Sequence, residues 1–140
     1  MNYQPADLKV LVVDDEAPAR SELMYLLEET GKVTVIGAAA NGTEAIDLIR
    51  SRGPEAVFLD IKMPGKDGLH VAEAVLAAEE EPPLFVFATA FDKYALQAFE
   101  VSAVDYILKP FTEERVAQAV ERLLSIRAGF KQKELSRNLQ

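Results

Sequence analysis

Short apolar runs alternate with stretches of helical periodicity along most of the chain. The runs are rich in valine, leucine, phenylalanine and alanine and are bounded by polar residues, which predicts buried strands at residues 8–13, 33–39, 56–59, 84–88 and 104–108. After each run, apolar residues recur at intervals of three and four, which is typical of amphipathic helices. This spacing predicts helices around residues 19–27, from 41 through 49, over 68–80, over 93–101, and from Thr112 onward.

Five strand–helix units in this order predict an α/β fold with a parallel sheet. Parallel strands of this kind are joined by right-handed crossovers, and helices cover both faces of the sheet. The nearly continuous apolar strands agree, because such strands are buried on both sides. Ligands in this architecture bind at the carboxyl ends of the strands, so the residues at those ends are the first candidates for function.

Charge divides the chain unevenly. The 140 residues carry 15 Lys and Arg against 23 Asp and Glu, a formal net charge of −8, which argues against direct binding of nucleic acid or an anionic membrane. Residues 126–140 are basic, with a local charge of +3, so residues 1–125 carry −11. We therefore expect a folded domain over 1–125 and a helix extension or linker tail over 126–140.

Composition excludes several kinds of site. The chain has no cysteine, which rules out disulfides, thiolate zinc sites and a cysteine nucleophile. Its single histidine, His70, rules out a multi-histidine metal cage and is expected on the surface. The N-terminal residues do not resemble a signal peptide, and no apolar run reaches the roughly 18 residues that span a bilayer. These features favour a cytoplasmic protein without membrane contact.

Polar residues follow four of the five predicted strands. Asp14 and Asp15 follow the first, Asp60 the third, Thr89 ends the fourth, and Lys109 follows the fifth. Each has an ordinary explanation as a helix cap, a turn residue or a surface residue. Together, however, they bring three carboxylates to one edge of a sheet. Two charges about 5 Å apart at an effective dielectric near 20 repel by roughly 3 kcal/mol, so such a cluster calls for a cation.

Oxygen ligands of this type suit Mg²⁺, and Lys109 adds a second positive charge. Phosphoryl transfer depends mainly on positioning and on neutralising charge, which these groups provide. A carboxylate can also be the nucleophile and form an aspartyl-phosphate.

Four segments, LVVDDE, VFLDIKMPGKDG, FVFATA and VDYILKPF, resemble the receiver domain of two-component response regulators of the CheY-like type. The resemblance covers residues 8–124. It implies a flavodoxin-like, doubly wound (βα)5 fold with strand order 2-1-3-4-5, and a phosphorylation-activated switch. The longer segment TAFDKYALQAFEVSAVDYILKPF resembles, more narrowly, the receivers of LytTR-type transcription regulators.

The resemblance also implies roles for individual residues. Asp60 is expected to be the phospho-acceptor. Asp15 is expected to bind Mg²⁺ directly, Asp14 largely through water, and Lys62 through its backbone carbonyl, with Asp60 completing the ligand set. Lys109 is expected to contact the phosphoryl oxygens.

Three further expectations concern the switch and its kinetics. The Lys109–Pro110 bond is expected to be cis. Thr89 would move to hydrogen-bond the phosphoryl group, and Tyr106 would turn inward behind it. Phe91, two residues after Thr89, flanks the path of the hydrolytic water in the family. We hypothesise that its bulk slows loss of the phosphoryl group, and the alternative is that it simply packs at a helix N-terminus.

A helical wheel over residues 93–101 separates the apolar side chains. Phe91, Ala95, Ala98 and Phe99 share one face, and Leu96 lies outside it. Since the fourth helix and fifth strand form a partner surface in the family, Leu96 is expected to belong to such a surface. We expect phosphorylation to promote a homodimer there.

The resemblance implies a sensor histidine kinase as the phosphohistidine donor, and DNA binding only through an output domain outside this chain. A stand-alone receiver or phosphorelay protein is the alternative. No enzymatic activity is expected beyond Mg²⁺-dependent self-phosphorylation and autodephosphorylation.

Two other classes fit less well. A phosphohydrolase of the haloacid dehalogenase type needs a DxDxT-like motif where this chain has DDEAP, and usually has cap insertions. A flavodoxin-like flavin binder needs a phosphate-cradling loop, whereas the first loop here is acidic.

Overall fold

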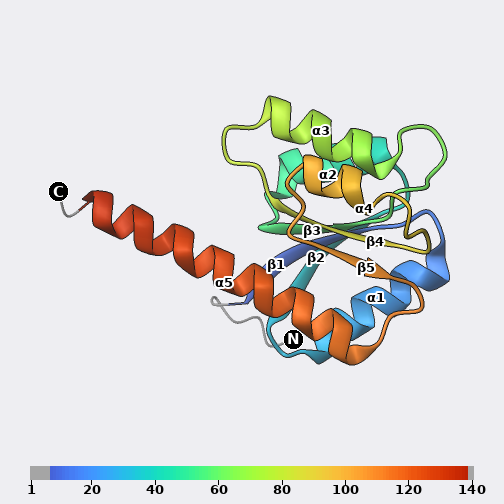
Figure 1. Ribbon diagram of the computed structural model, residues 1–140, viewed down its shortest axis with the longest axis horizontal. Coiled ribbons are helices and arrows are strands. Elements are labelled where there is room, and N and C mark those ends of the chain that lie inside the picture. The colour runs from blue at the N-terminus through green and yellow to red at the C-terminus, as the bar shows by residue number, and fades with distance from the viewer. Residues whose placement is uncertain (1–6, 139–140) are drawn as a thin grey trace.

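The structure is a computed structural model that describes residues 7–138. Five parallel strands form one sheet in the order β2-β1-β3-β4-β5 (Figure 1). The strands are β1 (Leu8–Val13), β2 (Val33–Ala39), β3 (Ala56–Leu59), β4 (Leu84–Thr89) and β5 (Asp105–Leu108). The helices are α1 (Ala17–Glu29), α2 (Gly42–Arg52), α3 (Gly68–Ala78), α4 (Ala95–Glu100) and α5 (Glu113–Asn138).

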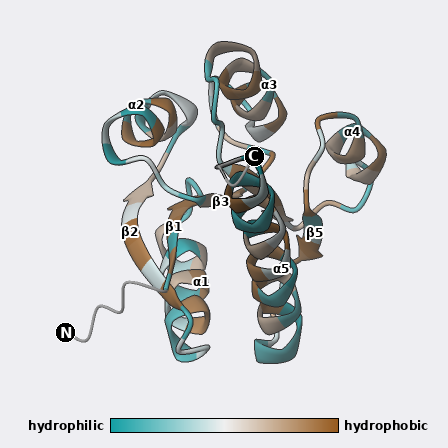
Figure 2. Ribbon diagram, turned by 90° about the vertical axis from the view of Figure 1, so that its left-hand side faces the viewer, coloured by the Kyte–Doolittle hydropathy of each residue, from teal (hydrophilic) through white to brown (hydrophobic). Residues whose placement is uncertain are grey.

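Helices cover both faces of the sheet, so the predicted doubly wound fold is confirmed. Helices α1 and α5 lie on one face, and α2, α3 and α4 lie on the other (Figure 2). Each face has its own apolar core. Leu27 of α1 and Leu123 of α5 belong to the first core, whereas Ile49 of α2, Val71 of α3 and Ala98 of α4 belong to the second. Alternate residues of each strand point into the two cores, which explains the continuous apolar runs.

Element boundaries differ from the predicted ones by up to three residues. Helix α3 ends at Ala78 because Glu79 is already extended, with φ −105° and ψ 136°. Helix α4 is shorter than predicted at both ends. Strand β4 includes Thr89, because this residue still pairs with Leu108 of β5. Strand β5 begins at Asp105 rather than at Val104.

The predicted start of the second helix is confirmed, and its cap explains it. The Asn41 side chain accepts a hydrogen bond from the Glu44 N–H at 2.9 Å, and the Glu44 carboxylate accepts one from the Ala40 N–H at 2.9 Å. This reciprocal pairing satisfies backbone donors that the first turn leaves open.

Helix α5 runs without interruption through residue 125, where sequence composition places the start of the tail. It projects well past the sheet (Figure 1). Beyond that residue it remains tied to the domain, because Arg127 Nη1 lies 3.2 Å from Glu55 Oε1. Residues 139 and 140 of the predicted tail lie outside the described part. Within residues 7–138, no helix has the length and hydropathy to cross a membrane.

Candidate functional site

The three acidic residues predicted to converge do so at the carboxyl edge of the sheet. Asp14 follows β1 and Asp60 follows β3, and their side chains are nearly buried, with residue exposures of 3% and 5%. Asp15 is exposed. One carboxylate oxygen from each of the three lies within 4.8 Å of the others. The site therefore combines two buried carboxylates with one that faces solvent.

One lysine spans the two buried carboxylates. Lys109 Nζ lies 2.8 Å from Asp14 Oδ2 and 3.0 Å from Asp60 Oδ2. It also approaches Glu16 Oε1 at 3.7 Å. The peptide bond from Lys109 to Pro110 is cis. The strand ends thus bring together residues separated by up to 95 positions in the chain.

The backbone around Asp60 leaves no space for a side chain at position 68. A Cβ atom on Gly68 would lie 2.1 Å from the Asp60 carbonyl oxygen. The Gly68 N–H donates to the Ile61 carbonyl at 2.8 Å, and the Ile61 N–H donates to Asp60 Oδ1 at 2.7 Å. Glycine at position 68 therefore lets α3 begin directly against the loop that orients the Asp60 carboxylate.

Burial raises the pKa of Asp60 above its ordinary value. Hydrogen bonds from Lys109 and Thr89 act in the opposite direction, and the charge of Asp14 adds to the increase. Burial alone would lower the pKa of Lys109, but its hydrogen bonds to Asp14 and Asp60 outweigh that effect and the pKa is raised. The lysine is therefore firmly protonated, yet it does not fully offset two buried carboxylates.

The Asp14 carboxylate has protein partners on both oxygens, unlike that of Asp15. Its Oδ1 accepts a hydrogen bond from the Glu16 N–H at 2.9 Å, its Oδ2 faces Lys109, and its carbonyl accepts from Arg20 Nη1 at 2.7 Å. Neither oxygen is without a partner, whereas the Asp15 side chain points into solvent. The direct and water-mediated ligand roles that the resemblance implies for the two residues stay predictions.

Lys62 lies in the loop that follows Asp60, and its side chain reaches the loop before α4. Its Nζ lies 5.3 Å from the centroid of the Tyr94 ring, and Lys93 Nζ lies at the same distance. A hydrogen bond from Lys62 is the main cause of the lowered pKa of Tyr94. The side chain is thus engaged with Tyr94, and the predicted metal ligand is the backbone carbonyl of this residue.

The predicted switch residues form a connected chain. Thr89 is fully buried, and its Oγ1 accepts a hydrogen bond from the Phe91 N–H at 3.4 Å. The Tyr106 hydroxyl donates a short hydrogen bond to the Phe91 carbonyl. Burial raises the pKa of Tyr106. Phe91 is partly exposed and meets Tyr94 edge to face, with centroids 6.3 Å apart, at the start of α4. Phe91 therefore does pack at a helix N-terminus, and its effect on hydrolysis stays a prediction.

The expected exposure of Leu96 is observed, and Phe99, on the other face of the helical wheel, is exposed as well. Leu96 is 71% exposed and Phe99 is 69% exposed, whereas Ala98 is buried. Helix α4 has only six residues and touches the core through a narrow stripe around Ala98, which leaves Phe99 in solvent. His70 is exposed, as expected, with Nδ1 3.2 Å from Asp67 Oδ1.

Sequence reasoning missed a third buried carboxylate. Asp105, 6% exposed at the start of β5, receives Arg115 Nη1 at 2.9 Å and Arg115 Nη2 at 2.6 Å. Arg122 adds a contact at 3.2 Å, and Arg115 Nη2 also donates to the Tyr106 carbonyl at 3.2 Å. Burial alone would raise the pKa of Asp105, but the arginine contacts outweigh it and the pKa is lowered. An acidic residue inside the apolar run VDYIL was the available signal.

Comparison with known proteins agrees with this geometry. The family model of the response regulator receiver domain matches residues 10–121, so the chain belongs to that family. The chain is 52% identical over 115 residues to the sensory transduction protein LytT of Bacillus anthracis, which covers 82% of this chain and 46% of that protein. It is 41% identical over 121 residues to the transcriptional regulatory protein LytR of Staphylococcus aureus strain N315, which covers 86% of this chain and 49% of that protein. The chain thus spans about half the length of these curated relatives.

Solved structures give the same fold. The response regulatory domain of mrkE from Klebsiella pneumoniae superposes with a TM-score of 0.78 at 33% identity, covering 85% of this chain and 97% of that one. The REC domain of AraT, a response regulator from Geobacillus stearothermophilus, has a TM-score of 0.78 at 27% identity, covering 89% and 98%. The predicted family and strand order are confirmed.

Proposed function

We propose that the chain is a phosphorylation-activated receiver whose acceptor is Asp60, and that a phosphohistidine on a sensor kinase is the donor. A carboxylate oxygen of Asp60 attacks phosphorus, the phosphorus–nitrogen bond breaks, and the leaving imidazole takes up a proton. The observation that supports this best is the buried Asp60 carboxylate beside Asp14 and Lys109, with a pKa raised by burial. Lys109 would hold the oxygens of the transferred group.

The donor set fits Mg²⁺. Asp15 offers an open carboxylate, Asp60 contributes a second, and the carbonyl of Lys62 lies in the adjoining loop. Asp14 would act through water, since both of its oxygens already have partners. The ion would neutralise charge on the transferring phosphoryl group. We propose no enzymatic activity beyond Mg²⁺-dependent self-phosphorylation and autodephosphorylation.

The connected switch residues support a route from the acceptor to the surface. A phosphoryl group on Asp60 would draw the Thr89 hydroxyl away from the Phe91 N–H. Tyr106, whose hydroxyl donates to the Phe91 carbonyl, would then turn inward. This movement would reshape the α4–β5–α5 face, where Leu96 stands exposed. We propose that the reshaped face forms a homodimer.

The relatives support a place for the switch in transcription control. LytT and LytR are about twice as long as the matched region, and LytR is named a transcriptional regulatory protein. We propose that this receiver governs a LytTR-type DNA-binding output of that kind, in the cytoplasm. A stand-alone receiver or phosphorelay protein is the alternative. It would be favoured if the natural chain lacked an output domain.

Intact mass after incubation with acetyl phosphate and Mg²⁺ tests the central proposal. The wild-type chain is expected to gain one phosphoryl group, and Asp60→Asn is expected to gain none. No gain in the wild type, or an equal gain in the variant, would refute Asp60 as the acceptor. Omitting Mg²⁺ from the wild-type reaction should suppress the gain.

Two further measurements address the face and the lifetime of the modification. Sedimentation should show that phosphorylation strengthens self-association of the wild type and leaves that of Leu96→Asp unchanged, while both accept the phosphoryl group. Phe91→Ala is expected to lose the phosphoryl group several-fold faster than Phe91→Leu, because a smaller side chain opens the path of water. Equal rates of phosphoryl loss for the wild type, Phe91→Ala and Phe91→Leu would show that Phe91 only packs beside Tyr94.

A further inference from the structure

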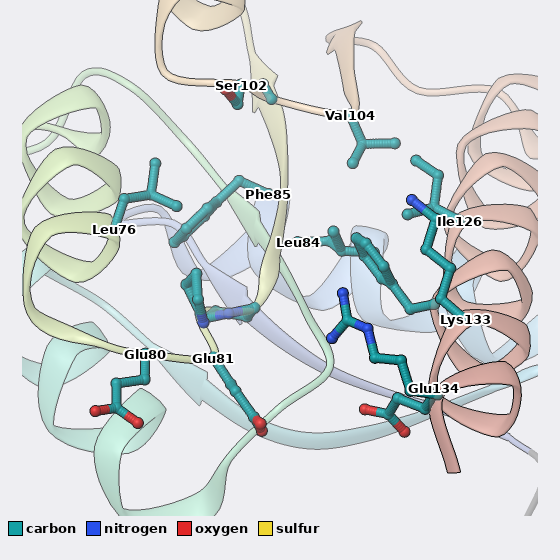
Figure 3. A pocket seen from close by; sticks show the side chains of 15 residues that line it. Leu76, Glu80, Glu81, Leu84, Phe85, Ser102, Val104, Ile126, Lys133 and Glu134 are labelled. Carbon is teal, nitrogen blue, oxygen red and sulfur yellow. The ribbon is translucent and has the colours of Figure 1, made fainter. Parts of the chain in front are cut away.

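A groove of about 870 Å³ opens at the edge of the sheet opposite Asp60, where β4 and β5 begin. We call it the basal groove. It runs between α3 and the loop after it on one side and the far half of α5 on the other (Figure 3). Its floor is apolar and is formed by Leu76, Leu84, Phe85, Val104, Ile126 and Phe130.

The two rims of the basal groove carry opposite charges. Glu80 and Glu81 stand on the rim formed by the α3–β4 loop, and Lys133 stands on the rim formed by α5, beside Glu134 (Figure 3). Arg137 of α5 also lines the groove. Among the described residues, none of these five side chains has an ion-pair partner within 4.0 Å. Both rims therefore present charge that the chain itself leaves unpaired.

The α5 wall of the groove also leaves apolar surface in solvent. Phe130 lines the groove yet is 54% exposed, and Leu135 on the same segment is largely exposed. Residues 126–138 have a net charge of +3 and measure about 20 Å at the rise of an α-helix. A helix segment with exposed aromatic surface and unpaired cations is suited to packing against an apolar floor beside an acidic rim.

The arrangement of charge points to one occupant. In a two-fold interface the same patch lies on both sides, so a residue i that contacts j is matched by a j that contacts i. The basal groove has an acidic rim and a basic rim on either side of an apolar floor. A two-fold axis that runs along the groove places each basic rim on the acidic rim of the other copy, whereas a partner of one sign would leave one rim unpaired or repelled.

We propose that the basal groove is a two-fold interface between two copies of this chain, in which residues 130–137 of each copy pack against the groove of the other. Phe130 from each copy would cover the apolar floor of its partner. Lys133 and Arg137 would pair with Glu80 and Glu81 across the interface. The contact lies at the far edge of the sheet from Asp60, so it does not depend on phosphorylation or on the α4 surface.

Sedimentation of the unphosphorylated chain over a concentration series tests the interface. The wild type is expected to dimerise, and Phe130→Asp is expected to raise the dimer Kd at least about tenfold. Leu96→Asp is the matched control, since it places the same charge on the α4 surface and should leave the Kd unchanged. A wild type that stays monomeric throughout, or a dimer lost in Leu96→Asp but kept in Phe130→Asp, would overturn the proposal.

Charge exchange gives a sharper test. One chain carries Glu80→Lys with Glu81→Lys, and the other carries Lys133→Glu with Arg137→Glu. Each alone should be monomeric, because its two rims have the same sign. An equimolar mixture should restore the dimer, because every rim then meets its opposite. Circular dichroism establishes that both chains are folded. Failure of the folded pair to associate would refute the interface and would leave phosphorylation of Asp60 untouched.

Discussion

Two buried carboxylates in this molecule have opposite surroundings. Asp60, at the carboxyl edge of the sheet, shares one lysine with Asp14, and its pKa is raised. Asp105, at the start of β5, is held by Arg115 and Arg122, and its pKa is lowered. Burial is nearly the same for both. The number and sign of the neighbouring charges make the difference.

The contrast separates a structural charge from a reactive one. The hydrogen bonds of Asp105 compensate for its burial, so it joins β5 to α5 and needs nothing more. The cluster around Asp60 has more negative than positive charge, which disfavours the ionised form and leaves room for a metal ion. A carboxylate with incomplete compensation is a better candidate for chemistry than one that is fully paired.

The largest expected effect comes from removing the cation at the acceptor edge. Lys109→Met leaves Asp14 and Asp60 buried together without compensation, and we expect the free energy of unfolding to fall by about 3 kcal/mol. Urea unfolding followed by circular dichroism without Mg²⁺ measures it. The control is Lys93→Met, which changes an exposed lysine and should leave stability almost unchanged. A loss for Lys109→Met no larger than that of the control would contradict the proposed imbalance.

Removing the main partner of Asp105 should have a somewhat smaller effect. Arg115→Ala breaks a two-point contact, and we expect a loss of about 2 kcal/mol, because Arg122 remains close. Arg122→Ala is the matched variant. Its side chain is more exposed than that of Arg115, so the loss should be under about 1 kcal/mol. Equal losses for the two variants in urea unfolding would show that the two-point geometry is unimportant.

Mg²⁺ should stabilise the protein by binding at the acceptor edge, and this stabilisation should not depend on the contacts of Asp105. At a concentration tenfold above its Kd, the ion is expected to raise the free energy of unfolding by about 1.4 kcal/mol. Thermal melts with and without Mg²⁺ measure this increase. In Asp15→Asn the increase should require much more Mg²⁺, whereas in Arg115→Ala it should persist in full. An unchanged requirement in Asp15→Asn would remove that residue from the ligand set.

The smallest expected effect is a difference in pH dependence. The folded pKa of Asp60 lies above its unfolded value, so the ionised form costs stability at neutral pH, and this cost disappears as pH falls below the unfolded value. Asp60→Asn should therefore be more stable than wild type at neutral pH, by under about 1 kcal/mol, with the difference shrinking in acid.

Asp105 has the opposite sign, because its folded pKa lies below the unfolded one. Its stabilisation is present above the unfolded value and is lost as pH falls through the folded value. Asp105→Asn should therefore be less stable than wild type at neutral pH, and the two should approach each other in acid. Urea unfolding without Mg²⁺ over a pH series measures both variants. Differences of the same sign would contradict the contrast between the two carboxylates.

Much of the fold and of the acceptor edge could be predicted because short-range pattern determines both. A buried parallel strand requires a run such as LKVLVV, and once the strands are placed, Asp14, Asp60 and Lys109 must meet at one edge. Neither step requires knowledge of how side chains pack.

The remainder depends on contacts that sequence spacing does not encode. Asp105 was visible as an acidic residue in an apolar strand, but nothing in the spacing identified Arg115 as its partner. Phe99 shares a helical face with the buried Ala98, yet α4 is too short to bury it. Gly68 resembles an ordinary turn residue until its distance to the Asp60 carbonyl is known. In each case the constraint comes from contacts that exist only in the folded structure.

The unbroken course of α5 has a mechanical consequence. The helix is attached to β5 through Arg122 and to Glu55 through Arg127, and it continues for 11 residues beyond Arg127 as a single rod. At 1.5 Å per residue, that lever arm is about 16 Å long. A tilt of about 10° at the attachment would displace the far end by about 3 Å, with no rearrangement inside the rod. A small change in the seat of α5 on β5 would thus become a movement several ångströms wide at the chain's C-terminal side.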